Sequence, residues 1–330
     1  MQRRHMQTRA GKKEMKILVT GGAGFIGSHL VEHFATAADV TVLDDLSAGH
    51  RSHLRAGECR IIQGSIMDRA VLARAIQGID QVFHLAAMIS VPESMLRPCE
   101  CVETNVIGTV NVLEAAAAEG VQKVVFASSA AVYGDDPTVP KVEDMAPKPR
   151  SPYAMTKLDG EFYCDLFQRE RGLKTASLRF FNVFGPRQDP KSPYAAAVPM
   201  FIERALRGEE ICIFGDGEQT RDFVYVKDVV SALAFAGGCE EVMGTYNVGY
   251  GQRMKVSEIA KKIIQLAGSQ ATIRYLPERL GDVKHSLASC QKLQDAGWSP
   301  SYDVNSGLRE TISHSRAKSL EAAAHFVAGP

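Results

Sequence analysis

Tyr153 and Lys157 are the two side chains in this chain of 330 residues whose types and spacing best suit acid–base chemistry. They are four residues apart, so a helix would place the phenol and the ammonium on one face. A phenol with an ordinary pKa of about 10 is a poor base at neutral pH, but a nearby cation stabilises its anion. We therefore predict that Tyr153 takes a proton from a hydroxyl group and that Lys157 lowers its pKa.

Two serines precede this tyrosine along the chain. Ser128 and Ser129 close the apolar segment 121–127, which predicts a strand. In α/β folds ligands bind at the carboxyl ends of strands, so the Ser129 hydroxyl there can share a substrate O–H with Tyr153. The Tyr-x-x-x-Lys spacing alone is common by chance, and it gains weight from following these serines and a glycine-rich turn.

That glycine-rich turn comes near the start of the chain. A short apolar strand at 17–20 is followed by Gly21-Gly22-Ala23-Gly24-Phe25-Ile26-Gly27 and then by a helical pattern. Glycines at 21, 24 and 27 permit a tight turn, close approach of phosphates, and close packing of helix on strand. The bare N–H groups and the positive helix end predict a pyrophosphate site.

An acidic residue completes this dinucleotide fingerprint. Asp44 ends the next predicted strand, where its carboxylate can accept both ribose hydroxyls. Asp45 follows it, and no Arg or Lys comes before Arg51, so two carboxylates would repel a 2′-phosphate. The predicted cofactor is NAD rather than NADP.

The composition excludes several classes of function. Lys and Arg total 38, as do Asp and Glu, so no net charge favours nucleic acid or an anionic membrane. No apolar run approaches the roughly 18 residues that span a bilayer. The seven cysteines form no Cys-x-x-Cys pair, and no histidine lies close to a cysteine pair in sequence. We therefore predict reduced thiols, a cytoplasmic location and no metal.

Strand-like and helix-like segments alternate as far as residue 180. Strands are predicted at 59–63, 81–86, 121–127 and 174–180, and helices at 67–77, 99–119 and 152–171. Such alternation implies parallel strands with helical crossovers. The predicted fold class is α/β, a Rossmann doubly wound parallel sheet with a smaller C-terminal α/β substrate-binding lobe.

The second half of the chain is less regular. A proline-rich loop at 185–193 is followed by short helices predicted near 198–207, 227–237, 256–267 and 289–296. We assign residues 15–181 to an NAD-binding domain and residues 182–316 mainly to the substrate lobe, with some segments returning to the Rossmann sheet. Residues 1–14 and 317–330 are expected to be disordered tails, and the first of these could also precede a start at Met15.

From about Lys16 to about Ser315 the chain resembles the extended branch of the short-chain dehydrogenase/reductase superfamily, which modifies nucleotide sugars. The motifs that carry the resemblance are Thr20 to Gly27, His84-Leu85-Ala86-Ala87, Ser128 to Gly134, Tyr153-x-x-x-Lys157, Arg179 to Pro186, Arg221 to Val226, and Arg279-Leu280-Gly281-Asp282. The resemblance implies that Ser129, Tyr153 and Lys157 are catalytic.

The resemblance also implies two sets of binding residues. Those for the cofactor are Gly21, Gly24, Phe25, Ile26, Gly27, Asp44, Ser65, Ile66, Leu85, Ala86, Ala87, Asn105, Ser128, Tyr153, Lys157 and Phe180. Those for the substrate are Ser90, Ser129, Tyr153, Asn182, Gln188, Phe214, Arg221, Arg279, Asp282 and Ser286. Arg221 and Arg279 offer planar forks for phosphate oxygens, and Phe214 could enclose a uracil.

The residues beside Ser129 bear on the reaction. Related dehydratases and decarboxylases carry an acidic residue there, whereas this chain has Ala130 and Ala131. The closest likeness is therefore to UDP-glucose and UDP-N-acetylglucosamine 4-epimerases, which oxidise C4 to a ketone and return the hydride to the opposite face. A UDP-glucuronate 4-epimerase, a 4,6-dehydratase and a non-catalytic NAD-bound regulator stay open as alternatives.

Substrate range and assembly follow from the same resemblance. Ser286 matches a gate position that faces the C2 substituent, and a small residue there leaves room for an acetamido group. Ile89 departs from the glycine common in forms that accept acetylated sugars, and its branched side chain would narrow the pocket. The helices expected at 99–119 and 152–171 are those through which relatives form homodimers.

Overall fold

The computed structural model describes residues 15–190, 196–278 and 284–327. The strands are β1 Lys16–Thr20, β2 Asp39–Asp44, β3 Arg60–Gln63, β4 Gln81–His84, β5 Lys123–Ser129, β6 Lys174–Phe180, β7 Asn182–Phe184, β8 Ile211–Phe214, β9 Thr220–Tyr225, β10 Gly244–Val248, β11 Arg253–Lys255 and β12 Ile273–Leu276. The α-helices are α1 Phe25–Phe34, α2 Arg69–Ile76, α3 Val91–Leu96, α4 Pro98–Val102, α5 Gly108–Glu119, α6 Pro152–Arg171, α7 Ala197–Arg207, α8 Val226–Gly238, α9 Val256–Ala267, α10 Gln291–Asp295 and α11 Val304–Val327.

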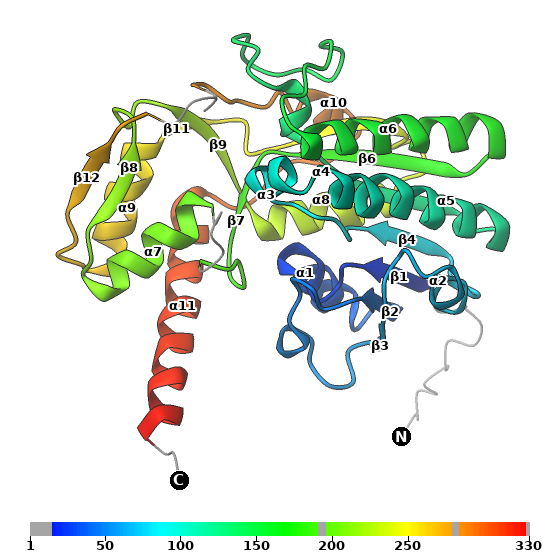
Figure 1. Ribbon diagram of the computed structural model, residues 1–330, viewed down its shortest axis with the longest axis horizontal. Helices are drawn as coiled ribbons and strands as arrows, with labels where there is room; N and C mark the ends of the chain where they lie inside the picture. Colours follow the sequence, from blue (N-terminus) through cyan, green and yellow to red (C-terminus); the bar gives the residue numbers. More distant parts are fainter. Residues whose placement is uncertain (1–14, 191–195, 279–283, 328–330) are drawn as a thin grey trace, which may run out of the picture.

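A seven-stranded sheet forms the centre of the larger lobe (Figure 1). Its order is β10-β6-β5-β4-β1-β2-β3, and every neighbouring pair is parallel. The order of strands 3-2-1-4-5-6 is that of a doubly wound dinucleotide-binding fold, with its switch point between β1 and β4. The predicted α/β Rossmann class is confirmed.

Helices cover both faces of this sheet. Ile17 and Val19 of β1 share a buried cluster with residues of α1 and α8, whereas Leu18 belongs to a second cluster with residues of α2, α5 and α6. Alternate residues of a strand point to opposite faces, so one strand contributes to both cores. This burial explains why the strands read as continuous apolar runs.

A smaller lobe is built from the second half of the chain and lies beside the sheet (Figure 1). It contains the sheet β11-β9-β7, the pair β12-β8, and a core shared by α7, α9 and α11. Two segments of this half return to the larger lobe, because β10 pairs with β6 and α8 packs beside α1.

Two regions differ from the elements expected from sequence. The helix expected at 99–119 is divided by a π-helical turn, Glu103–Ile107, between α4 and α5. The helix α11 continues to Val327, so residues 317–327 are helical where a disordered tail was expected. Alanines are strong helix formers, and an alanine-rich stretch follows residue 320. In the described part of the chain, no helix combines the length and apolarity that a membrane crossing requires.

Candidate active site

The turn between β1 and α1 can only be built from glycine at two positions. Gly21 has a φ of +71°, and a Cβ there would lie 2.7 Å from the backbone nitrogen of Ala86. A Cβ on Gly27 would lie 2.2 Å from the carbonyl oxygen of Gly21. The backbone is therefore drawn tight against itself at the start of α1, where the first-turn N–H groups have no intrahelical acceptor. These N–H groups can donate hydrogen bonds to a pyrophosphate.

Asp44 stands at the end of β2 beside this turn. Its buried carboxylate accepts the backbone N–H groups of Ala23 and Leu46, both at 2.8 Å. Burial raises the pKa of this carboxyl, and the two N–H donors oppose that effect. Each oxygen keeps a second lone pair, so the carboxylate can still accept a ribose hydroxyl.

Asn105 ties the segment after β4 to the helix that carries Tyr153. Its amide accepts from the Met88 N–H at 2.8 Å and donates to the Met88 carbonyl at 2.9 Å. The same side chain donates to Thr156 Oγ1 at 3.0 Å. It lies in the π-helical turn, a distortion found often at functional sites. Asn105 therefore links the segment after β4 to α6, the helix that carries Tyr153.

The other predicted cofactor residues lie at strand ends around these groups. The Ala86 N–H donates to Thr20 Oγ1 at 3.3 Å, and Ile66 is buried beside α5. Leu85, Ala87 and Ser65 are half-buried, as are Phe25 and Ile26 in the first turn of α1. Their placement at the carboxyl edge of the sheet fits a dinucleotide that crosses the switch point.

The side chains of Tyr153 and Ser129 interact, and this interaction lowers the pKa of the Tyr153 phenol. Ser129 Oγ also accepts the Ala131 N–H at 3.1 Å, so its own proton is available to Tyr153. The backbone N–H of Tyr153 donates to Ser94 Oγ at 3.2 Å, which anchors α3 beside it. Burial raises the pKa of Tyr153, against the depression expected from the lysine.

Lys157 is buried one helical turn after Tyr153. Its Nζ donates to the Ala127 carbonyl at 2.8 Å and lies 4.9 Å from the centre of the Phe126 ring. It lies 5.9 Å from the centre of the Tyr153 ring. Burial lowers the pKa of Lys157 to about 8, so the ammonium form persists at neutral pH. The structure thus brings together all three predicted catalytic side chains.

Two predicted cofactor residues have strong contacts within the protein. The buried Ser128 donates its hydroxyl to the carboxylate of Glu161 on α6. Phe180 pairs with Ser129 in the register of β5 and β6, and its side chain joins the core with α1 and α8. Any contact of these two residues with a dinucleotide stays a prediction.

Three predicted substrate residues, far apart in sequence, lie on neighbouring backbone segments of the smaller lobe. Asn182 of β7 pairs with Phe223 of β9, the strand that contains Arg221. Ser286 donates its N–H to the carbonyl of Thr220 at 3.0 Å, directly before Arg221. These three residues therefore share one edge of the lobe.

The remaining predicted substrate residues are more dispersed. Gln188 donates to the Val183 carbonyl at 3.2 Å, and its buried Oε1 has no hydrogen-bond partner among the described atoms. Phe214 ends β8, and Ser90 caps α3 by accepting the Glu93 N–H at 3.1 Å. The side chain of Ile89 is 68% exposed. Arg279 and Asp282 lie outside the described residues.

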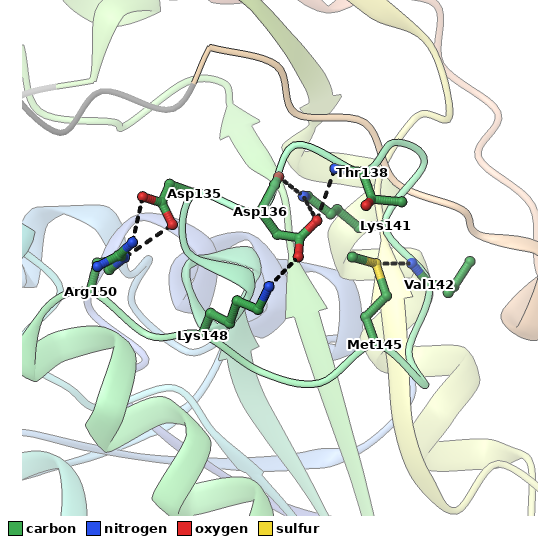
Figure 2. Close-up of polar contacts among 8 residues, drawn as sticks. All are labelled: Asp135, Asp136, Thr138, Lys141, Val142, Met145, Lys148 and Arg150. Atoms are coloured by element: carbon green, nitrogen blue, oxygen red, sulfur yellow. Dashed lines mark hydrogen bonds and ion pairs between the residues drawn. The ribbon is translucent and has the colours of Figure 1, made fainter.

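A loop joins the turn after Ser129 to the start of α6, and Figure 2 shows its polar contacts. Asp135 pairs with Arg150 at 2.8 Å, and Asp136 pairs with Lys148 at 2.8 Å. The Lys141 N–H donates to the Leu287 carbonyl at 2.7 Å, and the Lys141 carbonyl accepts from Ser289 at 2.8 Å. This loop therefore connects the catalytic end of β5 to the segment that carries Ser286.

Sequence analysis missed Glu161 and Asp222. Glu161 is four residues after Lys157, so its spacing was a readable sign that it shares the catalytic helix face. Asp222 is fully buried and accepts the N–H groups of Tyr250, Gly251 and Ala288. It fixes two separate segments next to Arg221, a role that only the folded chain reveals.

A sequence model of the NAD dependent epimerase/dehydratase family matches residues 17–249. The chain belongs to this family. The resemblance to extended short-chain dehydrogenases is thereby confirmed, and NAD is the cofactor of the family. The residues around the β1–α1 turn fit that cofactor, since glycine is required where a Cβ would collide and the Asp44 carboxylate beside the turn has acceptor capacity left for a hydroxyl.

Relatives of known name cover nearly the whole chain. A UDP-glucose 4-epimerase of Mycolicibacterium smegmatis is 39% identical over 313 residues, which cover 92% of this chain and 100% of the relative. A UDP-N-acetyl-alpha-D-glucosaminuronate decarboxylase of Bacillus cytotoxicus is 37% identical over 90% of this chain and 96% of its own.

A solved structure is equally similar. The UDP-N-acetylglucosamine 4-epimerase of Methanobrevibacter ruminantium, in complex with UDP-N-acetylmuramic acid, has a TM-score of 0.90 and 39% identity, covering 93% of this chain and 100% of that one. Epimerases and a decarboxylase share these features, so membership of the epimerase/dehydratase family does not by itself separate the two reactions.

Proposed function

We propose that this protein inverts C4 of a UDP-hexose. The proposed substrates are UDP-glucose with UDP-galactose and, alongside them, UDP-N-acetylglucosamine with UDP-N-acetylgalactosamine. The observation that carries the proposal is the interaction of Tyr153 with Ser129 at the end of β5, followed by the turn Ala130–Tyr133, which contains no carboxylate. This turn therefore provides a base for one hydroxyl and no acid of its own.

The residues of the chain have distinct parts in this reaction. Tyr153 takes the proton of the 4-hydroxyl and later returns it to the same oxygen. Ser129 orients that oxygen, and Lys157 supports the Tyr153 phenolate and would hold the nicotinamide ribose. When bound, NAD⁺ would supply reversible hydride chemistry at C4 of the sugar.

Three carboxylates near the end of β5 are paired with cations, which argues against elimination or decarboxylation. Glu161 is paired with Arg179 at 2.7 Å and is buried. Hydrogen bonds from Lys148 and Arg150 hold the pKa values of Asp136 and Asp135 below their usual range. Because Asp135 and Asp136 stay ionised and Glu161 is engaged by Arg179, none of the three is suited to donate a proton to a leaving hydroxyl.

The smaller lobe supports a nucleoside diphosphate as the handle of the substrate. Arg221 and Asn182 lie on adjoining strands, and both side-chain types donate to phosphate oxygens. Ser286 lies on the next segment and is small enough to leave space for a C2 substituent. The named relatives that act on UDP-sugars agree with this choice.

One incubation tests the proposal. The purified protein with its bound cofactor is given UDP-glucose, UDP-N-acetylglucosamine, UDP-glucuronate or dTDP-glucose, without added reductant, and the isomers are identified by NMR. We expect galacto isomers of the first two sugars. A 4-keto-6-deoxy sugar or a pentose with released CO₂ would identify a dehydratase or a decarboxylase instead.

We further propose that two copies pair through α4, α5 and α6. Large apolar side chains are exposed on this side of the domain, namely Val102 at 44%, Ile107 at 46%, Met155 at 55%, Phe162 at 61% and Leu166 at 42%. Met155, Phe162 and Leu166 recur at spacings of seven and four, so they form one stripe of α6. Sedimentation should give a dimer, and Phe162→Glu should give a monomer.

A further inference from the structure

Glu161 and Arg179 form a buried ion pair behind the catalytic helix. Arg179 Nε lies 2.9 Å from Glu161 Oε1 and Nη2 lies 2.7 Å from Oε2, and the two side chains are 5% and 6% exposed. Ser128 and Arg179 are partners in the register of β5 and β6, so both reach the same carboxylate. A bidentate pair with a third donor is the geometry that a buried charge requires.

The pair extends into a wider network. Arg179 Nη1 donates to the Tyr133 hydroxyl at 2.8 Å, and that hydroxyl donates to Asn247 Oδ1 at 2.7 Å. Asn247 in turn donates to the Lys141 carbonyl at 3.0 Å. The network therefore connects α6 to β5, β6, β10 and the loop of Figure 2.

Three residues on one face of α6 bind three consecutive residues of β5. Lys157 is hydrogen-bonded to Ala127 and Glu161 to Ser128, and the side chain of Tyr153 interacts with that of Ser129. The spacing of four and four on the helix keeps these side chains in line. A shift of α6 along β5 would break all three contacts together.

We propose that Glu161 and Arg179 are positioning residues for the reaction, holding Lys157 and Ser129 in register with Tyr153 and balancing the charge beside the Lys157 ammonium. This inference rests on the proposed function, because a positioning role has meaning only if Tyr153 and Lys157 take part in a proton transfer. Neither residue touches the reacting atoms, and each acts through its neighbours on α6 and β5.

The groups around Lys157 show why the charge of Glu161 matters. They are Tyr153, Glu161 and Cys164 on α6, Cys101 on α4 and His84 on β4. Glu161 in turn contacts Arg179 on β6, which contacts Tyr133 in the turn after β5. Burial raises the pKa values of the two thiols and of Tyr133, and it lowers that of His84, so these four groups are neutral near pH 7. Within this set, Glu161 is the anion and Arg179 its counter-ion.

The test uses two variants of opposite charge and their combination. Glu161→Gln leaves the Arg179 cation unpaired. The alkaline limb of the kcat profile, the decline of kcat at high pH, should therefore lie about one pH unit lower. Arg179→Met leaves the Glu161 anion unpaired, so the limb should move up by a similar amount. The double variant is neutral, and its limb should return close to that of the wild type.

Opposite shifts with restoration in the double variant would support the positioning role. Shifts in the same direction, or losses of kcat without any shift in folded protein, would overturn it. Circular dichroism and bound NAD content verify folding. Should Arg179→Met fail to fold, Glu161→Asp replaces it as the matched variant, because it keeps the charge and should keep the limb.

A second readout separates this inference from the proposed function. The absorbance of the Tyr153 phenolate can be titrated in the holoenzyme by subtracting the spectrum of Tyr153→Phe. Glu161→Gln should lower the midpoint, and Glu161→Asp should leave it unchanged. If the wild type converts no sugar, the proposed function fails while this titration still decides the role of the pair, and equal midpoints in the two variants would refute it.

Discussion

The Lys157 ammonium donates a hydrogen bond of 2.8 Å to the carbonyl oxygen of Ala127, two residues before Ser129. This contact fixes the lysine against β5. Burial lowers the pKa of Lys157 to about 8, so the cation that supports Tyr153 is present at neutral pH and is lost under alkaline conditions. The end of β5 thus contacts both residues: the Ala127 carbonyl holds Lys157, and the Ser129 side chain interacts with Tyr153.

Replacing Tyr153 by Phe should remove nearly all turnover and leave the fold intact. The change deletes the proton acceptor and keeps the ring, and loss of a general base costs about 10²–10⁴-fold in rate. Ser129→Ala should slow kcat less, since it removes an orienting group only. Epimerisation at the wild-type rate by the Tyr153→Phe protein would refute the mechanism.

Replacing Asp44 by Ala should weaken the retention of NAD. The carboxylate is lost as a ribose acceptor, and the N–H groups of Ala23 and Leu46 lose theirs. The matched control is Asp45→Ala, because Asp45 is exposed and its Oδ1 accepts from Ser47. Cofactor released on denaturation, measured by chromatography, should be NAD(H). Recovery of NADP(H) would contradict the assignment.

Replacing Gly160 by Ala should destabilise the protein, although Ala favours helices. A Cβ at Gly160 would lie 2.4 Å from Cζ of the Phe126 ring, so α6 would have to move away from β5. Overpacking of this kind costs about 1–3 kcal/mol. Gly238, at the end of α8, has nothing within 4 Å of such a Cβ, so Gly238→Ala should be neutral or stabilising. Chemical denaturation compares the two, and equal stabilities would be evidence against close packing at Gly160.

Stability should fall in mild acid because of His84. It is fully buried, its ring nitrogens lie 2.7 and 2.9 Å from Thr20 and Thr109 hydroxyls, and burial lowers its pKa to about 3. Below an ordinary pKa of about 6.5 the unfolded chain binds this proton and the folded chain does not, so the free energy of unfolding falls by up to ~1.4 kcal/mol per pH unit. His84→Gln should show a shallower slope between pH 6 and pH 4. Parallel curves for the two proteins would refute this origin.

Replacing Ser286 by Tyr should abolish turnover of acetylated sugars and spare UDP-glucose. The backbone of Ser286 is fixed by its bond to Thr220, so a large side chain is expected to occupy the space of the acetamido group. Ser286→Ala serves as the control and should keep both activities. If both activities fall together in Ser286→Tyr, the gate assignment is incorrect.

Local signals account for the elements that sequence predicted best. The helix 152–171 and the strand 174–180 have the expected bounds, because Ser151 caps the helix, Pro152 starts it and Gly172 ends it with a left-handed conformation. The π-helical turn at 103–107 was missed since its contacts, from Asn105 to Met88 and Thr156, are far apart in sequence. The hydrophobic periodicity of a single segment gives no information about such long-range contacts.

The same reasoning applies to the site. Tyr153 and Lys157 are readable from their spacing, whereas the ion pair of Glu161 with Arg179 depends on β5 and β6 lying side by side. Ser128 was assigned to the cofactor by its motif, but its hydroxyl is directed at Glu161. A motif identifies which residues matter, and packing decides which way each side chain turns.

The backbone of Lys141 is hydrogen-bonded to both Leu287 and Ser289, the two neighbours of Ala288. Leu287 directly follows Ser286. The loop between Ser129 and Tyr153 and the segment that carries Ser286 therefore form one structural unit. Exchanging residues 284–290 alone for those of a relative would leave the paired loop mismatched and disturb Tyr153 as well as the sugar. Engineering of a new sugar range should transplant residues 134–150 and 284–290 together, as a single exchangeable part.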